Sequence, residues 1–260
     1  MHDVPLWLTA VVVTLLAMAY AVGLMLLTRY AYGVSRLSLN NEVAGFKFAV
    51  VGVFYAVMLA FVVIAVWEDY RDTEAAVRSE ATAGADLYRV TFALPEDGGA
   101  DIRGHLTSYV KDVIKDEWPS MAVGKASETV TRHLNKLSAA IFAVQPADQK
   151  QVSLYEQALD LLTVMSDTRA KRLDSAAGSV PAIMWFVLIV GGLITLGYPA
   201  FFASSNVIAQ ILMTASLAAL VALSLLLGLA FDYPFTGDPH ISPAPFEEAL
   251  DEMPAKWPRP

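Results

Sequence analysis

The stretch NNEVAGFKFAVVGVFYAVMLAFVVIAVWEDY, residues 40–70, decides the fold of this chain. From Phe48 to Trp67 it is apolar apart from Tyr55. About 20 residues of helix, each rising about 1.5 Å, suffice to cross a hydrocarbon core of about 30 Å. Polar and charged residues stand at both ends of the run. The stretch therefore predicts a helix that spans a membrane.

Small residues recur along one side of this predicted helix. They are Gly45, Ala49, Gly52, Ala56 and Ala60. Spacings of three and four residues fall on one helical face, and small side chains there let another backbone approach closely in lipid. Two interpretations stay open. The face either packs against other helices or lines a narrow pore with an apolar constriction that gates by dewetting.

Polar residues at both ends of the span are candidates for the mouths of such a pore. Asn41, Glu42 and Lys47 precede the apolar run, and Glu68 and Asp69 follow it. The long stem of Lys47 can also simply carry its charge to the lipid headgroups. Glu68 and Asp69 would form an acidic ring if several copies surrounded an axis. Otherwise they are a solvated helix end.

Three further apolar runs occupy residues 4–27, 181–203 and 207–231. The chain of 260 residues is 56% hydrophobic, with a mean hydropathy of +0.49, and the excess lies in these four runs. The first run lacks the basic start of a cleaved signal peptide, so we expect a retained helix. Four spans place both ends of the chain on one side of the membrane.

The segment between the second and third spans carries most of the charge. It retains helical periodicity, with stripes that begin at Tyr70, Ile102, Val130 and Val152. No stretch alternates with period two for long, so the sequence predicts an all-α fold. We expect a membrane hairpin (1–67), a helical-bundle soluble domain (68–180), a second hairpin (181–231) and a Pro-rich acidic tail (232–260). The tail should be mostly extended or disordered.

The distribution of basic residues predicts the orientation. Arg29, Arg36 and Lys47 make the connection between the first two spans the most basic short segment near a membrane end. The positive-inside rule places this connection in the cytoplasm, which puts the soluble domain outside the cytoplasm.

Composition and motifs exclude several classes of function. The net charge of −8 and the pI of about 5.0 argue against nucleic acid as a partner. The chain has no cysteine, and its histidines (His2, His105, His133, His240) do not stand at metal-ligand spacing. Motifs for phosphate loops, dinucleotides and hydrolases are absent. We therefore predict no enzyme activity, no metal and no cofactor.

Several motifs together resemble those of the bestrophin-like bacterial membrane proteins. They are the NEVAGF of residues 41–46, the run 51–61, Trp67-Glu68, Glu117-Trp118-Pro119, the DYPFTG of residues 232–237 and Ile241-Ser242-Pro243. The resemblance covers nearly the whole chain. Bestrophins are pentameric anion channels with a pore along the fivefold axis, so the resemblance implies a channel. They keep their soluble part in the cytoplasm, which is opposite to the side that the charge indicates.

The first functional hypothesis is a homo-oligomeric ion channel or pore of the bacterial inner membrane, with the second span lining its axis. Its partners would be the lipid bilayer, further copies of the chain and inorganic ions. The alternative is a membrane-anchored sensor or scaffold whose helical domain binds a ligand or a partner protein. A stoichiometric partner recovered by crosslinking would favour this alternative.

Overall fold

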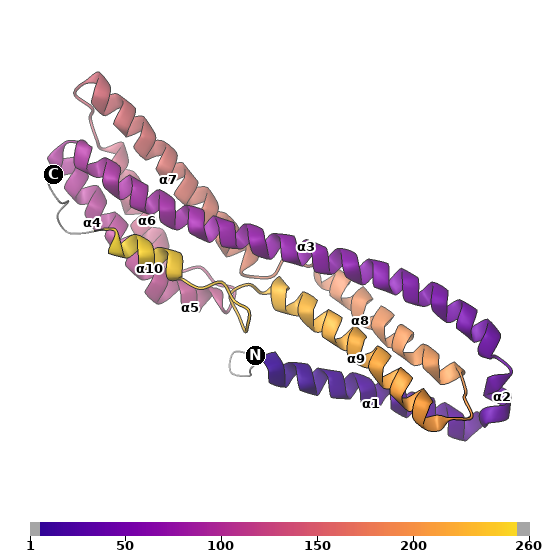
Figure 1. Cartoon of the computed structure of the whole chain (residues 1–260). Helices are drawn as coiled ribbons and strands as arrows, with labels where there is room; N and C mark the ends of the chain where they lie inside the picture. Colours follow the sequence, from indigo (N-terminus) through magenta and orange to yellow (C-terminus); the bar gives the residue numbers. More distant parts are fainter. Residues whose placement is uncertain (1–5, 254–260) are drawn as a thin grey trace. The chain divides into compact units, whose positions relative to one another are not determined.

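A computed structural model describes residues 6–253 and is drawn in Figure 1. The described residues form helices and no strand, which confirms the prediction of an all-helical chain. Four of the helices are long and apolar enough to cross a membrane. The chain divides into two compact units. The apolar unit comprises the chain up to Glu68, Ser179–Asp232 and Gly237–Pro239. The polar unit comprises Asp69–Gly178, Tyr233–Thr236 and the chain from His240 on.

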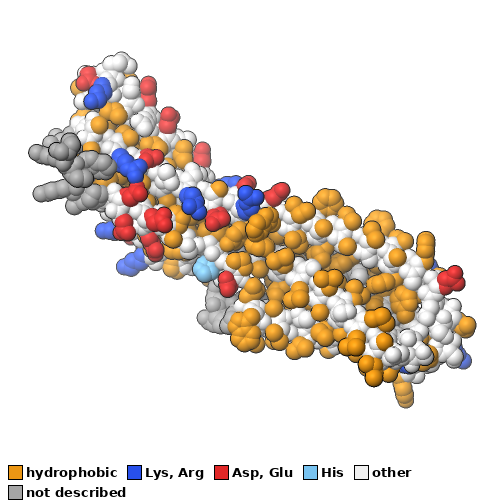
Figure 2. Space-filling view, in the orientation of Figure 1, with side chains coloured by type: hydrophobic (Ala, Val, Ile, Leu, Met, Phe, Trp, Pro, Cys, Tyr) orange, Lys and Arg blue, Asp and Glu red, His pale blue; other side chains and the backbone are white. Residues whose placement is uncertain are grey.

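The apolar unit is built from the long helices. These are α1 (Leu6–Tyr32), the first part of α3 (Asn41–Val90), α8 (Ala182–Gly197) and α9 (Val207–Asp232). α1 packs mainly against α9 and more lightly against α8. Many large apolar side chains of this unit are exposed (Figure 2), which suits a lipid environment and not water. The expected start of the first span at Val4 lies outside the described residues.

Two interruptions of regular α-helix, at Gly33 and at Pro199, lie at the end of the apolar unit where α1 ends. Gly33 has a φ of 76°, a conformation that favours glycine, and it separates α1 from the short helix α2 (Val34–Ser38). Pro199 lies in a 3-10 turn, η3 (Tyr198–Phe201), that follows α8. The α-helix of the expected third span therefore ends at Gly197, because proline cannot donate the next backbone hydrogen bond.

The polar unit combines the rest of α3 with shorter helices. They are η1 (Thr91–Ala93), α4 (Glu96–Asp112), η2 (Val113–Glu117), α5 (Trp118–Met121), α6 (Glu128–Phe142), α7 (Gln149–Ser175) and α10 (Ala244–Asp251). The predicted stripes form its core, since Val77, Ile102, Val130 and Leu162 are buried together. The hydroxyl of Ser127 caps α6 by accepting a hydrogen bond from the Val130 amide.

The structure corrects one expectation about this unit in part. Residues 244–251 of the tail form the helix α10, and Phe246 is fully buried against Trp118. Prolines and acids dominate the composition of the tail and obscure this short apolar face. The helical segment after η1 continues past Trp118-Pro119 to Met121. α4 ends at Asp112, and a π-helical turn, η2, connects it to α5.

Candidate functional site

The small-residue face of α3 is not the face that α3 buries within the apolar unit. Its buried stripe there consists of Tyr55, Leu59, Val62 and Val66, which belong to the core formed with α8 and α9. Along the small-residue face, Ala49, Ala56 and Ala60 are exposed and Gly45 and Gly52 are half-buried. The two stripes are adjacent on the helix. Other helices of the same chain bury the first stripe, whereas the small-residue face stays largely exposed.

The glycines of this face have room beside them. A Cβ added at Gly45 would lie 3.7 Å from the Phe202 ring, and one added at Gly52 would meet nothing within 4 Å. Gly52, Ala56 and Ala60 line a groove of about 380 Å³ whose opposite wall is α9. The small side chains therefore border open space in a single chain and do not serve a tight helix contact there.

Among the proposed mouth residues, Asn41 forms hydrogen bonds within the chain, and most of the charged ones are exposed. The side-chain amide of Asn41 donates to the Ala203 carbonyl oxygen over 2.8 Å and accepts from the Ala203 amide over 3.1 Å, so it holds the loop after η3. Glu42 and Lys47 are exposed near it. At the other end of the apolar stretch, Glu68 is exposed and Asp69 is half-buried.

Four charged side chains form a buried network in the polar unit that the sequence interpretation missed. The Arg172 guanidinium donates to Glu80 over 2.8 and 2.9 Å and to Glu117 over 2.8 Å. Arg169 donates to both oxygens of Glu117, over 2.6 and 3.1 Å. Glu80, Glu117 and Arg172 are fully buried. The network joins α3, the π-helical turn and α7.

The charges of this network balance one another, which makes their burial possible. Burial of Glu117 raises its pKa, but the bonds from Arg169 and Arg172 outweigh that effect, so the pKa is lowered. Burial lowers the pKa of Arg172, and Glu80 more than reverses this, so the pKa is raised. Tyr109 donates its hydroxyl to Glu80, and burial followed by the Glu80 charge raises the pKa of Tyr109.

A signal for the network existed in the sequence. Arg169 and Arg172 continue the stripe of Leu162 and Met165 at spacings of four and three residues, and Glu80 follows Val77 on the buried side of α3. Charged residues at stripe positions indicate that they are buried as ion pairs.

The buried network links α3, the π-helical turn and α7. Among residues 6–253, no group of three or more His, Cys, Asp or Glu side chains could hold a metal ion.

A further buried carboxylate, Asp232, lies in the apolar unit. It accepts from the Ser179 amide at 2.9 Å and hydroxyl at 3.2 Å, from the Val180 amide at 2.9 Å and from the Trp185 indole at 2.9 Å. Asp232 thereby fastens the end of α9 to the start of α8 and to Ser179 and Val180, which precede it.

Comparison with known proteins gives a family and a fold. A family model for the bestrophin-like domain matches residues 15–246. A bacterial bestrophin homolog from Klebsiella pneumoniae has a similar crystal structure, with a TM-score of 0.71 and 13% identity over 92% of this chain and 96% of that one. A variant of that homolog gives a TM-score of 0.70 at 14% identity, with the same coverage of both chains. A further crystal structure, described as a membrane protein, gives 0.72 at 13% identity over 92% and 97%.

No protein of curated function matches the sequence. The identities to the solved structures are low, so those likenesses show a shared fold. The family match covers most of the chain and includes both the apolar and the polar unit. The resemblance inferred from the sequence motifs is thereby confirmed, and this chain is a membrane protein that belongs to the bestrophin-like family.

Proposed function

We propose that the chain is the subunit of a homo-oligomeric ion channel of the bacterial inner membrane, with α3 lining the axis. The observation that supports this proposal is that α3 has one buried stripe and one open face in the apolar unit. One stripe, from Tyr55 to Val66, packs on the chain's own helices, and the neighbouring small-residue face is left open. The family to which the chain belongs favours a channel over an enzyme.

A path for ions would require several copies of the chain. The apolar unit has four long helices, and its large apolar side chains are exposed outward. In an assembly, the α3 helices of several copies would surround one axis. Small apolar side chains such as Ala49, Ala56 and Ala60 would then form a constriction that water and ions cross only when it is wetted.

Conductance of the purified protein in a planar bilayer under a salt gradient tests this proposal. We expect discrete currents, and the sign of the reversal potential will identify the permeant ion as an anion or a cation. Gly52→Leu should reduce or abolish the current, because it fills the open face of α3. Gly23→Leu is the matched control, since Gly23 on α1 also has nothing within 4 Å of an added Cβ. Silence from folded oligomeric protein, or a monomer in lipid, would overturn the proposal.

The mouth residues are tested in the same recordings. Glu42 and Lys47 would stand at one end of the path, and Glu68 and Asp69 at the other. Charge at a pore mouth concentrates ions of opposite sign. Lys47→Glu should therefore shift the reversal potential, and an unchanged potential would leave Lys47 with the simpler role of reaching the headgroups.

The proposal also includes an orientation, in which the chain crosses the membrane four times and the polar unit lies outside the cytoplasm. The support is the basic connection that carries Arg29, Arg36 and Lys47. Because the chain has no cysteine, single-cysteine variants can report sidedness. Ser38→Cys in α2 and Ser153→Cys in α7 are both exposed positions. A membrane-impermeant maleimide added to intact spheroplasts should label Ser153→Cys and spare Ser38→Cys. The reverse pattern would place the polar unit in the cytoplasm.

A further inference from the structure

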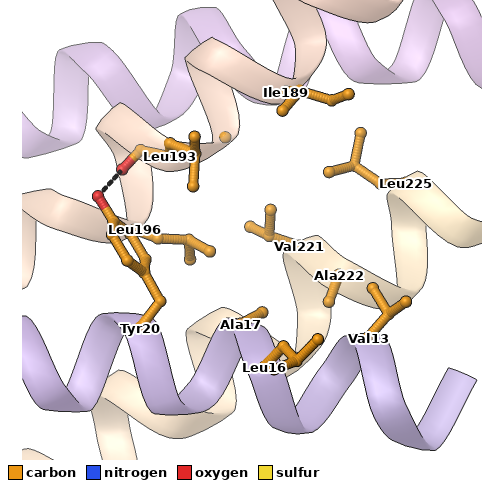
Figure 3. A pocket seen from close by; sticks show the side chains of 11 residues that line it. Val13, Leu16, Ala17, Tyr20, Ile189, Leu193, Leu196, Val221, Ala222 and Leu225 are labelled. Carbon is orange, nitrogen blue, oxygen red and sulfur yellow. Dashed lines mark hydrogen bonds between the residues drawn. The ribbon is translucent and has the colours of Figure 1, made fainter.

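Two cavities follow one another along α1 in the apolar unit. The first, of about 300 Å³, lies between α1, α8 and α9 and is lined almost entirely by apolar side chains (Figure 3). The second, of about 360 Å³, lies between α1, α8 and η3. Tyr20 and Leu193 line both cavities. We call the two together the α1–α8 groove.

The α1 wall of the groove is one helical stripe. It consists of Val13, Leu16, Ala17, Tyr20, Leu24 and Thr28. From Val13 to Thr28 the helix rises about 22 Å, which exceeds the depth of about 15 Å of one leaflet of the hydrocarbon core. A single extended acyl chain therefore fits the length of the groove.

The hydroxyl groups of Tyr20 and Thr28, on the α1 wall of the groove, already have hydrogen-bond acceptors. The Tyr20 hydroxyl donates to the Leu193 carbonyl oxygen, as Figure 3 shows, and the Thr28 hydroxyl lies within hydrogen-bond distance of the Met25 and Ala200 carbonyl oxygens. An occupant of the groove would therefore meet apolar surface along most of its length. This character fits a hydrocarbon chain.

A cation without a carboxylate partner comes one residue after Thr28, the last α1 residue that lines the groove. Arg29 directly follows Thr28, and its Nη1 atom donates to the Ser204 carbonyl oxygen over 2.7 Å and to the Gln210 Oε1 atom over 3.0 Å. Both acceptors are neutral. Within residues 6–253, no carboxylate forms a salt bridge with the half-buried Arg29. Two neutral acceptors orient the guanidinium and leave its charge uncompensated, which favours an anion from outside the chain.

We propose that the α1–α8 groove binds one anionic phospholipid per subunit, with an acyl chain between α1 and α8 and the phosphate group at Arg29. Neither feature alone selects this ligand. A free phosphate would not use the groove. The α1 or α8 helix of a second copy contains no acidic residue, so it would fill the groove without supplying an anion to Arg29. The combination of a groove of acyl length with a terminal guanidinium selects an anionic lipid. This proposal does not require that the protein conducts ions.

Native mass spectrometry of the full chain in detergent tests the proposal, with dioleoylphosphatidylglycerol and dioleoylphosphatidylcholine as probes. We expect one phosphatidylglycerol per subunit that survives activation, and weaker retention of phosphatidylcholine. Arg29→Gln should weaken phosphatidylglycerol binding about tenfold, or about 1.4 kcal/mol. Arg29→Lys should restore most of it, because the charge remains. Arg36→Gln removes an exposed cation of the same connection and should change binding little.

A second pair of variants tests the groove itself. Ala17→Phe fills the first cavity, and Leu15→Phe adds a ring at an exposed position of α1 outside both cavities. Only Ala17→Phe should reduce lipid retention, in protein shown by circular dichroism to be folded. If Ala17→Phe fails to fold, the Arg29 variants decide.

Three results would overturn the proposal. Equal retention of the two lipids, or full retention by Arg29→Gln, would remove the role of the anion. Displacement of the lipid by excess inorganic phosphate would show that the chain in the groove contributes nothing. Dissociation of the oligomer by Ala17→Phe, with lipid retention unchanged, would show that a second copy fills the groove.

Discussion

Many large apolar side chains are exposed on the part of α3 in the apolar unit, and most are buried on the part in the polar unit. In the apolar unit, Phe54 and Phe61 are 70% exposed, whereas in the polar unit, Val77 and Leu87 are fully buried. Figure 2 shows the corresponding surfaces, with apolar side chains over one unit and charged ones over the other. A large exposed phenylalanine is costly in water and costs little in lipid. One helix can therefore belong to two cores that follow different rules.

Buried polar groups differ between the units in the same way. The polar unit neutralises its buried carboxylates Glu80 and Glu117 with guanidinium groups. The apolar unit satisfies Asp232 with amide, hydroxyl and indole donors instead. In addition, the buried hydroxyl of Tyr55 has no hydrogen-bond partner among the described residues. The polar unit should thus depend on charge pairs, and the apolar unit on close packing.

Loss of Arg172 should have the largest effect. Arg172→Leu leaves Glu80 without its guanidinium and removes one of the two that bind Glu117, and breaking a buried pair in this way costs about 3–5 kcal/mol. Lys171→Gln is the control, because Lys171 pairs with Asp72 at an exposed site and such pairs contribute about 0–1 kcal/mol. Thermal unfolding in detergent, followed by circular dichroism, should separate the two variants clearly. Similar losses would mean that the network does not stabilise the polar unit.

Acid should weaken the polar unit through Glu117. Its pKa is lowered in the folded state, so its contribution is complete above the unfolded pKa of about 4.3 and is lost as the pH falls through the folded pKa. We expect constant stability from neutral pH to about pH 5 and a decline below that. Glu117→Gln should be less stable at neutral pH and should show a shallower decline in acid. Glu74→Gln, at an exposed site, should keep the slope of the original protein, and identical slopes for all three would contradict the prediction.

Close packing in the apolar unit is tested at Gly192. A Cβ added there would lie 2.9 Å from the Tyr55 hydroxyl oxygen, so Gly192→Ala should cost about 1–3 kcal/mol. Gly52→Ala meets nothing within 4 Å and should leave the stability of the subunit unchanged. Adding Tyr55→Phe to Gly192→Ala should recover much of the loss, because the hydroxyl is the nearest atom. Failure of this rescue would show that the contact is relieved elsewhere.

The helices of the polar unit follow from periodicity in the sequence, and those of the apolar unit follow from long apolar runs. The stripes through Ile102 and Val130 predict buried faces because a soluble helix needs one apolar side. The π-helical turn at residues 113–117 has no such signature, since it inserts into a helix without changing its composition. α10 escaped prediction because eight residues carry too little periodic signal among prolines and acids.

The candidate site could be predicted only in part. Small residues at helical spacing indicated a special face on α3, but that spacing alone gives no indication of which neighbour, if any, covers the face. Tyr55 packs on α8 against two glycines, Gly191 and Gly192, because only residues without a side chain leave room for its ring. Contacts between Glu117 and Arg169 depend on tertiary structure, because 52 residues separate them in the chain.

The Tyr55 hydroxyl should show the smallest effect and the clearest contrast with the polar unit. Tyr55→Phe removes a buried group that has no partner, so the stability of the subunit should change by less than about 1 kcal/mol and could rise. Tyr109→Phe removes a hydroxyl that donates to the Glu80 carboxylate, and such bonds contribute about 1.5–3 kcal/mol. Both variants keep the ring and its packing, so thermal unfolding in detergent compares the hydroxyl groups alone. A large loss from Tyr55→Phe in the oligomer, but not in a dissociated subunit, would mean that a second copy supplies the missing acceptor. Equal losses from the two variants in the dissociated subunit would contradict the distinction between charge pairing in one unit and packing in the other.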